Sequence, residues 1–329
     1  MSALGITGLD PALEASLLSD MVRVEELLRS HIKGDYPLLV ETSRHLVEAG
    51  GKRLRPLLVL LAAQFGDPTR YSAIQAAVVV ELTHLATLYH DDVMDEAPLR
   101  RGVVSANNRW GNTVAILTGD YLFAKSSALL ADLGPEAVRL QASTFERLVI
   151  GQISETQGFT TGLTPLEHYL KVVADKTGSL IAASARYGAM VTGADAEVME
   201  TLTKFGEAIG VTFQLADDVI DIASTTNESG KTPGTDLREG VPTLVTLFVL
   251  ESEDSKDAQL RELLSAPITD EAVVASTLVA LRKHDAMAKS RALLESYAED
   301  SRKLLATLPA GAAKEALISL CETVINRTA

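Results

Sequence analysis

The sequence is short of cysteine, of aromatic residues and of positive charge, and each shortage excludes a class of protein. With Cys321 as the only cysteine among 329 residues, an intramolecular disulfide and a cysteine zinc site are excluded, so we expect a reducing, cytoplasmic compartment. The 44 acidic residues outnumber the 30 basic ones and leave a net charge of −14, which argues against nucleic acid as a partner. Aromatic residues make up 5% of the chain and hydrophobic residues 47%, which favours aliphatic helix packing over a β-sandwich.

The sequence also leads us to expect neither a signal peptide nor a membrane segment. Its first residues, "MSALGITGLDPALEASLL", do not combine a basic stretch with an apolar one. No apolar run approaches the roughly 20 residues that span a bilayer. We therefore expect a protein without an integral membrane segment.

Helical patterning extends over nearly the whole chain. Asp10 stands before Pro11 as an N-cap before a proline at N1, and Thr164 and Glu167 have the spacing of a capping box. Alternating strand patterns, flexible linkers and internal repeats are absent, and a long irregular segment covers 224–240. The sequence thus predicts one all-α domain over residues 1–329. Its expected helices lie near 10–32, 36–49, 56–65, 70–92, 111–131, 136–158, 164–176, 179–191, 195–223, 241–252, 256–265, 269–285, 287–305 and 310–325.

Two acidic motifs of the form D-D-x-x-D lie in these apolar helices. The first comprises Asp91, Asp92 and Asp95, and the second comprises Asp217, Asp218 and Asp221. Residues four apart are neighbours on a helix, so each motif places two carboxylates on one face, where they repel each other. Such oxygen ligands suit Mg²⁺, which takes one or two carboxylates together with water and phosphate oxygens. One motif could be a solvated helix end, but two of them, facing each other across a bundle, indicate a metal site.

Cationic residues stand close to these motifs along the chain. They are Lys52, Arg53 and Arg55 after the Gly50-Gly51 turn, Arg100 and Arg101, Lys176 beside Thr177, and Lys231. The first group is not a phosphate-binding P-loop, because Leu46 stands where that motif needs its first glycine. Any one cation could be surface charge, but the set, combined with Mg²⁺-binding carboxylates, indicates a diphosphate site.

These residues resemble those of the trans-isoprenyl diphosphate synthases, or polyprenyl synthetases. "GGKRLRP", "HLATLYHDDVMDEAPLRRG", "GDYLFA", "DKTG", "FQLADDVIDI" and "GKTPGTDLREG" occur in that family's order from about residue 50 to 243. The resemblance implies the all-α isoprenoid synthase bundle around a deep central cavity, usually as a homodimer. It also implies elongation of an allylic diphosphate by isopentenyl diphosphate, with about three Mg²⁺ ions per active site.

By matching position, the resemblance assigns a role to each motif residue. Asp91 and Asp95 bind the Mg²⁺ ions on the allylic diphosphate, and Asp217 binds a further Mg²⁺ with support from Asp218 and Asp221. The allylic diphosphate is held by Arg100, Lys176, Thr177, Gln214 and Lys231. Isopentenyl diphosphate is held by Lys52, Arg53, His84 and Arg101. A lone histidine on such a helix, as His84 is, is more often a packing residue. Val241 replaces a lysine that many relatives carry, so a contact from that position is lost or replaced.

Product length should depend on the helix that leads to Asp91. The positions one turn back are Ala86 and Thr87, two turns back Leu82 and Thr83, and three turns back Val79 and Val80. None is aromatic, whereas relatives with short products commonly carry Phe or Tyr one turn back. We expect an all-trans polyprenyl diphosphate of roughly C30–C50.

Other functions fit the residues less well. A farnesyl- or geranylgeranyl-length product is the nearest alternative. A class I terpene cyclase shares the first motif but carries a different second metal motif and needs no isopentenyl diphosphate site. A non-catalytic subunit typically lacks the aspartates, and all six are present here.

Overall fold

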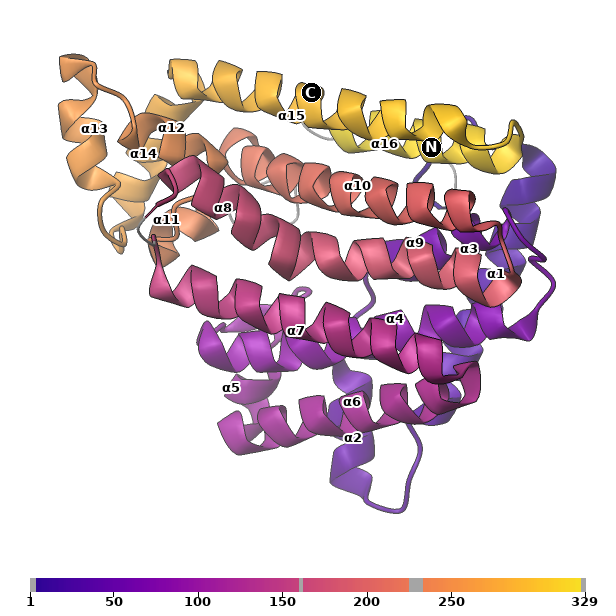
Figure 1. The fold of residues 1–329 in the computed structure, drawn as a ribbon. Coiled ribbons are helices and arrows are strands. Elements are labelled where there is room, and N and C mark those ends of the chain that lie inside the picture. The colour runs from indigo at the N-terminus through magenta and orange to yellow at the C-terminus, as the bar shows by residue number, and fades with distance from the viewer. Residues whose placement is uncertain (1–3, 160–161, 225–232, 327–329) are drawn as a thin grey trace. The chain divides into compact units, whose positions relative to one another are not determined.

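The computed structural model describes residues 4–159, 162–224 and 233–326, and nearly all of its regular structure is α-helical (Figure 1). The main α-helices are α1 (Pro11–His31), α2 (Pro37–Glu48), α3 (Leu54–Ala63), α4 (Tyr71–Met94), α6 (Asn112–Leu133), α7 (Pro135–Gln157), α8 (Pro165–Val173), α9 (Ser179–Thr192), α10 (Ala196–Ala223), α12 (Leu244–Leu250), α14 (Glu271–Lys283), α15 (Asp285–Leu304) and α16 (Ala312–Asn326). The short elements are β1 (Leu99–Arg100), β2 (Val103–Val104), α5 (Ala106–Trp110), the π-helix η1 (Ala174–Gly178), α11 (Thr235–Glu239), α13 (Ala258–Leu263) and the 3₁₀ turns η2 (Ser255–Asp257) and η3 (Leu305–Thr307).

The all-α expectation is confirmed, and so are the two helix starts expected from the sequence. The side chain of Asp10 accepts hydrogen bonds from the amides of Ala12 and Leu13, at 3.0 and 2.9 Å. Thr164 and Glu167 form the reciprocal capping box, in which each side chain bonds the other's backbone amide. Local side-chain chemistry therefore determines where α1 and α8 begin.

Several local features of the described chain depart from the sequence expectation, and the short helix α5 between the expected helices 70–92 and 111–131 is one of them. A two-stranded antiparallel hairpin, β1–β2, follows the first acidic motif. The segment expected as irregular contains the short helix α11, while its residues 225–232 lie outside the described part of the chain. The boundary between α8 and α9 is a π-helical turn over "ADKTG". Each is too short to produce a periodic pattern in the sequence.

The chain folds into two compact units. The first comprises Met1–Glu146, Leu180–Gly206 and Thr307–Leu317, and the second comprises Arg147–Ser179, Glu207–Ala306 and Ile318–Ala329. Helices α7, α10 and α16 each have residues in both units. The single domain expected from the sequence stays a prediction.

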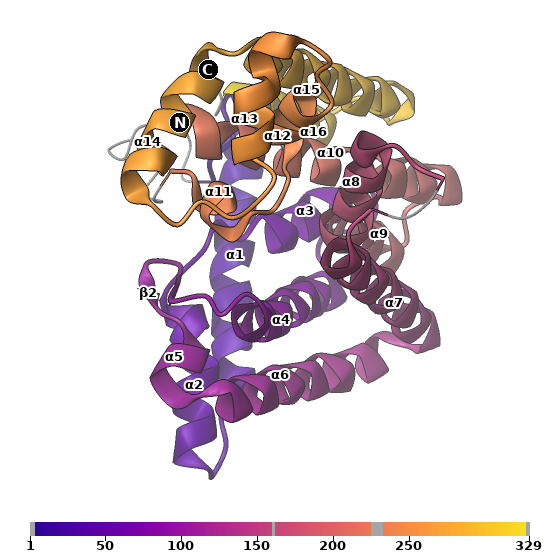
Figure 2. The ribbon, with the colours of Figure 1, turned by 90° about the vertical axis from the view of Figure 1, so that its left-hand side faces the viewer.

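In the first unit α4 packs most extensively against α6, and it also contacts α1, α3 and α5 (Figure 2). Most of α4 is buried, including the run Ala76–Leu82. Gly188 lets α9 approach α3 closely, since a Cβ there would lie 2.1 Å from the Val59 carbonyl oxygen. In the second unit α12 contacts α8, α13 and α15, and α14 packs on α15.

Two of the described helices are apolar and long enough to cross a membrane by length and composition alone, so the expected absence of an integral membrane segment stays a prediction. They are α4 and α6, and 72% of the most apolar window of α4 is buried, against 39% in α6. The burial of α4 is that of a helix in a protein core. By contrast, α6 leaves apolar residues exposed, including Ile116 and Leu117, which are 42% and 58% accessible.

Replacing Gly188 by alanine should destabilise the protein by about 1–3 kcal/mol, because the added methyl group collides with the backbone of α3. This figure is the net change, in which the collision outweighs the gain of about 1 kcal/mol in helix propensity. Urea unfolding followed by circular dichroism measures the change. Gly34→Ala is the matched control, because its new methyl group meets only the Tyr121 hydroxyl, at 3.8 Å. Equal midpoints for the two variants would contradict the packing of α9 on α3.

Candidate functional site

Asp91 and Asp95 lie at the C-terminal end of α4. Asp91 is in the last turn, and Asp95 is the C-cap, with its amide donating to the Asp91 carbonyl at 2.8 Å. The helix dipole places partial negative charge at this end, so it adds to the repulsion between the carboxylates. An external cation would relieve that repulsion, and the side chain of Asp95 is 38% accessible to one.

Asp92 has a different role from its two neighbours. It is fully buried, and its Oδ1 accepts a 2.5 Å hydrogen bond from Nε of Arg100. Its Oδ2 has no hydrogen-bond partner within the described part of the chain. Burial raises the pKa of this carboxyl, and Arg100 opposes that shift. Arg100 also lies 3.9 Å from Asp95, so Asp92 holds this arginine beside the more accessible carboxylate of the motif.

The hairpin after α4 positions Arg101. Arg101 and Gly102 connect β1 to β2, and both have positive φ angles, 54° and 78°. Two such residues form a type I′ turn, in which an arginine is unusual because its Cβ is crowded. The guanidinium compensates with protein contacts, donating to the carbonyls of Leu46 (2.8 Å) and Gly50 and lying 3.7 Å from Glu81. A strained backbone thus holds this cation at α4.

The glycine pair of "GGKRLRP" makes room for the same guanidinium. A Cβ on Gly51 would lie 2.9 Å from Cζ of Arg101, and the φ angle of Gly51 is 145°. At Gly50 a Cβ would meet nothing, but its φ of 85° also favours glycine. The pair is therefore explained by turn geometry and by close approach of a charged side chain.

Arg53, expected to hold isopentenyl diphosphate, is already bonded to the protein. Its Nε donates to Glu25 at 2.5 Å and its Nη1 to Glu81 at 2.8 Å, while the carbonyls of Gly50 and Val47 accept further bonds. Its side chain is 9% accessible. An arginine has five N–H donors, so these contacts leave little capacity for a substrate oxygen.

Arg55 belongs to the set of cations that indicates a diphosphate site, but the resemblance assigned it to neither substrate. It lies in the first turn of α3, and its buried Nε has no hydrogen-bond partner in the described residues. Burial lowers the pKa of its guanidinium to about 10, while Glu81 acts in the opposite direction. Arg55 therefore stays charged at neutral pH. In the sequence, Arg53 and Arg55 belong to the same motif, "GGKRLRP", and nothing in the motif distinguishes the two arginines.

His84 lies on α4 seven residues before Asp91, where burial and the surrounding arginines Arg55, Arg101 and Arg100 act on it. Burial is the larger cause, and together these hold the pKa of His84 well below its usual 6.5. The ring is therefore neutral at pH 7 and can act as a hydrogen-bonding group. Lys52 is exposed at the start of the same segment as Arg55.

The second acidic motif, in the second unit, lies near the end of α10 and is anchored by Asp218. This residue is 3% accessible and accepts bonds from the Tyr169 hydroxyl, the Gln214 amide (3.0 Å) and the Leu244 backbone amide (3.3 Å). Burial raises its pKa to about 6 in spite of these bonds. Asp218 therefore connects α10 to α8 and α12, and its expected support of a metal ligand stays a prediction.

Lys176 and Thr177 lie on the π-helical turn η1. Lys176 pairs with Glu155 of α7, and the Thr177 hydroxyl donates to Gln214 at 3.4 Å. A Cβ on Gly151 would lie 2.7 Å from the Lys176 amide nitrogen, so that glycine lets α7 approach the turn. Single π turns inside helices are frequent at functional sites. Gln214 thus joins Thr177 to Asp218 within the second unit.

The remaining acidic residues fit a metal that takes few protein ligands. Asp221 accepts the Gly234 amide through its carbonyl, at 3.2 Å, and the Thr235 amide through its side chain, at 3.4 Å. Over residues 4–159, 162–224 and 233–326, no group of three or more His, Cys, Asp or Glu side chains could by itself hold a metal ion. Mg²⁺ commonly uses one or two carboxylates and completes its shell with water and phosphate oxygens, so this donor set fits it. Lys231 lies outside the described residues.

The positions expected to affect product length line the buried side of α4. Ala86 and Leu82 are fully buried, and Thr87 is 8% accessible. Thr83 belongs to a buried polar network in the first unit. Its hydroxyl lies 3.1 Å from that of Ser126 on α6 and accepts from Gln141 of α7 at 2.9 Å. The helices facing Thr83 are therefore α6 and α7.

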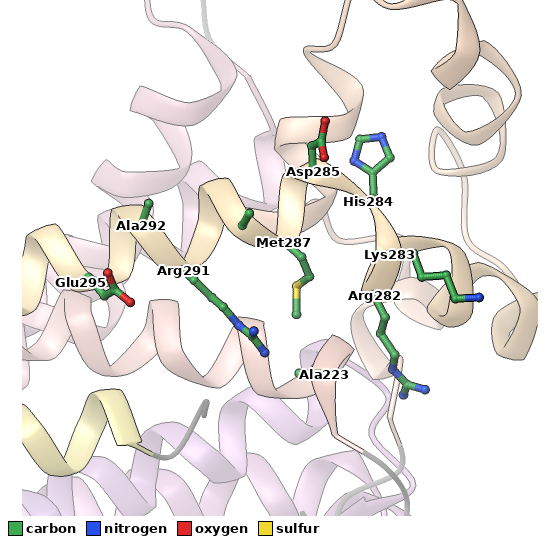
Figure 3. Close-up of a pocket in the computed structure, with 10 residues that line it drawn as sticks. Ala223, Arg282, Lys283, His284, Asp285, Met287, Arg291, Ala292 and Glu295 are labelled. Atoms are coloured by element: carbon green, nitrogen blue, oxygen red, sulfur yellow. The ribbon is translucent and has the colours of Figure 1, made fainter.

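A pocket of about 640 Å³ lies elsewhere, at the junction of α14 and α15. Figure 3 shows Arg282, Met287 and Arg291 extending toward Ala223, while His284 and Asp285 point the other way. Arg282 donates to the carbonyls of Ile222 and Ser224, both at 2.7 Å, so it stabilises the end of α10. None of the predicted site residues that the structure describes lines this pocket.

Comparison with known proteins gives matches over almost the whole chain. The profile of the family described as Polyprenyl synthetase matches residues 36–281. A nonaprenyl diphosphate synthase from Mycobacterium tuberculosis is 47% identical over 319 residues, covering 97% of this chain and 95% of the relative. Heptaprenyl diphosphate synthase component 2 from Geobacillus stearothermophilus is 39% identical over 310 residues, covering 94% and 96%.

A solved structure is similar to the same extent. It is the crystal structure of a geranylgeranyl pyrophosphate synthase from Corynebacterium glutamicum complexed with calcium and isoprenyl diphosphate. Its TM-score is 0.87 at 45% sequence identity, with 97% of this chain and 98% of that chain covered. The similarity therefore spans the regions of both acidic motifs.

Proposed function

This chain belongs to the polyprenyl synthetase family and is a trans-prenyltransferase, and from that premise we propose how its residues act. The reaction condenses an allylic diphosphate with isopentenyl diphosphate through C1 of the allyl group and C4 of the isopentenyl group. Each cycle releases diphosphate and lengthens the allylic chain by five carbons. The observation that carries the assignment of roles is the charge arrangement on α4. Its end presents Asp91 and Asp95, and the buried Glu81 ten residues earlier is surrounded by arginines.

The acidic motifs provide the metal ligands. We assign Asp91 and Asp95 to Mg²⁺ on the allylic diphosphate, and Asp217, supported by Asp218 and Asp221, to a further Mg²⁺, with about three ions in all. When bound, the ions neutralise charge on the diphosphate oxygens and make it a better leaving group. The similar Corynebacterium structure contains calcium and isoprenyl diphosphate, which supports a divalent metal at such carboxylates.

The cations hold the two diphosphates. Arg100, fixed by Asp92, is assigned with Lys176, Thr177, Gln214 and Lys231 to the allylic diphosphate. Lys52, His84 and Arg101 are assigned to isopentenyl diphosphate. We add Arg55 to this second group, because its buried Nε lacks a partner among the described residues, whereas Arg53 is bonded to four acceptors. Arginine binds phosphate oxygens bidentately, so an available guanidinium is the better ligand.

The chemical steps follow from these assignments. Cationic side chains stabilise the negative charge that develops on the departing diphosphate, so the allylic C–O bond breaks to give a carbocation. The π electrons of the isopentenyl double bond then form the new bond to C1 of that cation. Loss of a proton from the condensed product restores a double bond, and the released diphosphate is the base we propose for it. The apolar surroundings of α4 exclude water, which would otherwise capture the carbocation.

The product is proposed to be an all-trans polyprenyl diphosphate of roughly C30–C50, because the residue one helical turn before Asp91 is small. Ala86 occupies that position, and none of the α4 residues at the positions one, two and three turns before Asp91 is aromatic. Similar proteins named for nonaprenyl and heptaprenyl products support a long chain, and one named for geranylgeranyl pyrophosphate supports a shorter one. The measured chain length of the product distinguishes a long-chain synthase from a shorter-chain one.

We further propose that the protein is a cytoplasmic homodimer. α6 exposes several apolar residues, on a side where Asp120 is also exposed, and their exposure is unfavourable in water: Ile116, Leu117, Ala124, Ala128 and Ala131. The small alanines would let a second copy approach closely. A buried apolar interface of this kind is typical of stable homodimers.

The purified chain should release diphosphate only when Mg²⁺, isopentenyl diphosphate and an allylic primer are all present. Activity without isopentenyl diphosphate would indicate a cyclase, and inactivity of the single chain would indicate a subunit that needs a partner. Asp91→Asn should lower kcat by about a hundredfold or more, since it removes a metal ligand. Asp300→Asn is the matched control, because that carboxylate is 65% accessible and pairs only at the surface.

Ala86→Phe should shorten the product, because the ring would occupy the space that the growing chain needs. Chromatographic sizing of product made from radiolabelled isopentenyl diphosphate measures the length. Ala312→Phe, on the exposed first turn of α16, should leave it unchanged. A wild-type product of C15 or C20 would refute the proposed length, and an unchanged length in Ala86→Phe would refute the path past Ala86.

Leu117→Glu should convert the protein from dimer to monomer, because it places a charge among the exposed apolar residues of α6. Sedimentation velocity at micromolar concentration measures the change. Val22→Glu makes the same substitution at an equally exposed position on α1, 58% accessible, and should stay dimeric. A monomeric wild-type protein would contradict the proposed dimer.

A further inference from the structure

Glu81 is a buried carboxylate for which the proposed reaction has no direct use. It lies on α4 and is 2% accessible. Its Oε1 accepts from Arg53 at 2.8 Å and lies 3.7 Å from Nη2 of Arg101. It also interacts with Arg55, whose charged form it favours. One negative charge thus attracts three buried or half-buried arginines.

This arrangement is held in place by contacts on both sides. Glu25 of α1 binds Arg53 through a different nitrogen from Glu81, so the chain Glu25–Arg53–Glu81–Arg101 connects α1, the start of α3, α4 and the β1–β2 turn. Arg53 and Arg101 both have positive φ angles, 48° and 54°. A non-glycine residue keeps such a conformation only where its surroundings enforce it, at a cost of about 1–3 kcal/mol.

Without Glu81 the arginines would repel one another and leave a buried charge unpaired, a situation that proteins avoid strongly. Two of them, Arg55 and Arg101, are assigned above to isopentenyl diphosphate. Arg53, in contrast, has its donors engaged by Glu25, Glu81 and backbone carbonyls. Its contacts fit support of Glu81 rather than contact with substrate.

We infer that Glu81 and Arg53 are positioning residues for the isopentenyl diphosphate site. Glu81 holds the guanidinium of Arg101, and favours the charged form of Arg55, before substrate arrives. Arg53 fixes Glu81 from the side of α1. The inference rests on the proposed function, since it presupposes that Arg55 and Arg101 bind this diphosphate.

Simple electrostatics and a positioning role of Glu81 predict opposite changes in KM for isopentenyl diphosphate when this carboxylate is lost. A negative charge near an anion site weakens anion binding, so removing it would lower KM for isopentenyl diphosphate if charge alone mattered. If Glu81 positions the arginines, removing its charge raises that KM. The sign of the change therefore separates the two interpretations.

The experiment measures steady-state kinetics of Glu81→Gln, which keeps the shape of the side chain. KM for isopentenyl diphosphate should rise about tenfold, while kcat and KM for the allylic diphosphate change less than about threefold. Glu41→Gln is the matched control, because it removes an exposed carboxylate that pairs with Arg109 at 3.0 Å, and it should match wild type. An unchanged or lower KM in Glu81→Gln would overturn the inference.

A double-mutant cycle tests the role of Arg53. If Arg53 acts through Glu81, then Arg53→Gln and the double variant Arg53→Gln/Glu81→Gln should show the same KM increase as Glu81→Gln alone. Additive increases would show that Arg53 touches substrate itself and would overturn its positioning role.

If Glu81→Gln does not fold, Glu25→Gln tests the same network of ion pairs. Glu25 is 29% accessible and binds Arg53, so its loss should raise the same KM about threefold without loss of helical signal. No change would count against the network. Failure of the proposed function itself is recognised separately, because wild type would then release no diphosphate in response to isopentenyl diphosphate.

Discussion

Charge compensation along α4 is the constraint on which the first unit depends. The helix is built of Ala, Val and Leu in its middle and carries acidic residues at Glu81 and at its C-terminal end. Each carboxylate needs a counter-charge, because buried or crowded negative charge is costly. Arg53 and Arg101 supply it for Glu81, and Arg100 supplies it for Asp92. Asp91 and Asp95 are the pair for which we propose metal and diphosphate as the counter-charge.

This constraint explains features that look unrelated in the sequence. The Gly50-Gly51 turn, the hairpin and the unusual backbone of Arg101 all serve to bring one guanidinium to α4. Arg53 and Arg55 are two residues apart, yet one is bonded to four acceptors and the other has an unpartnered buried Nε in the described structure. The difference arises because Arg53 is the N-cap residue of α3, with an αL backbone, whereas Arg55 lies inside the helix.

In the second unit the buried carboxylate of Asp218 is stabilised by hydrogen bonds, where the first unit uses ion pairs. Asp218 is buried and hydrogen-bonded by Tyr169, Gln214 and the Leu244 amide, so its carboxylate has a fixed position next to Asp217 in the sequence. Gln214 also accepts a hydrogen bond from Thr177 on the π turn. Arg147 connects that turn to α10 through ion pairs with Asp175 and Glu207. The buried part of this network, around Asp218 and Tyr169, is rigid because both side chains are hydrogen-bonded.

The sequence by itself determined the all-α class, the helix starts at Asp10 and Thr164, and the two acidic motifs with their cations. These are local patterns: helical periodicity, capping residues and spacing along one helix can all be recognised from neighbouring residues. It did not show the hairpin or the π turn, because segments of two to five residues have no period to detect.

Only the tertiary structure decided which members of each motif are committed to holding the protein together. Asp92 and Asp218 are buried and held by specific side chains, and Arg53 is saturated by protein acceptors while the Arg55 Nε has no partner in the described residues. Residues far apart in sequence produce these differences, since Glu25, Glu81 and Arg101 come from separate segments of the chain. Residue type and spacing predict a charged site, but long-range packing decides which of its charged side chains are engaged by other protein groups.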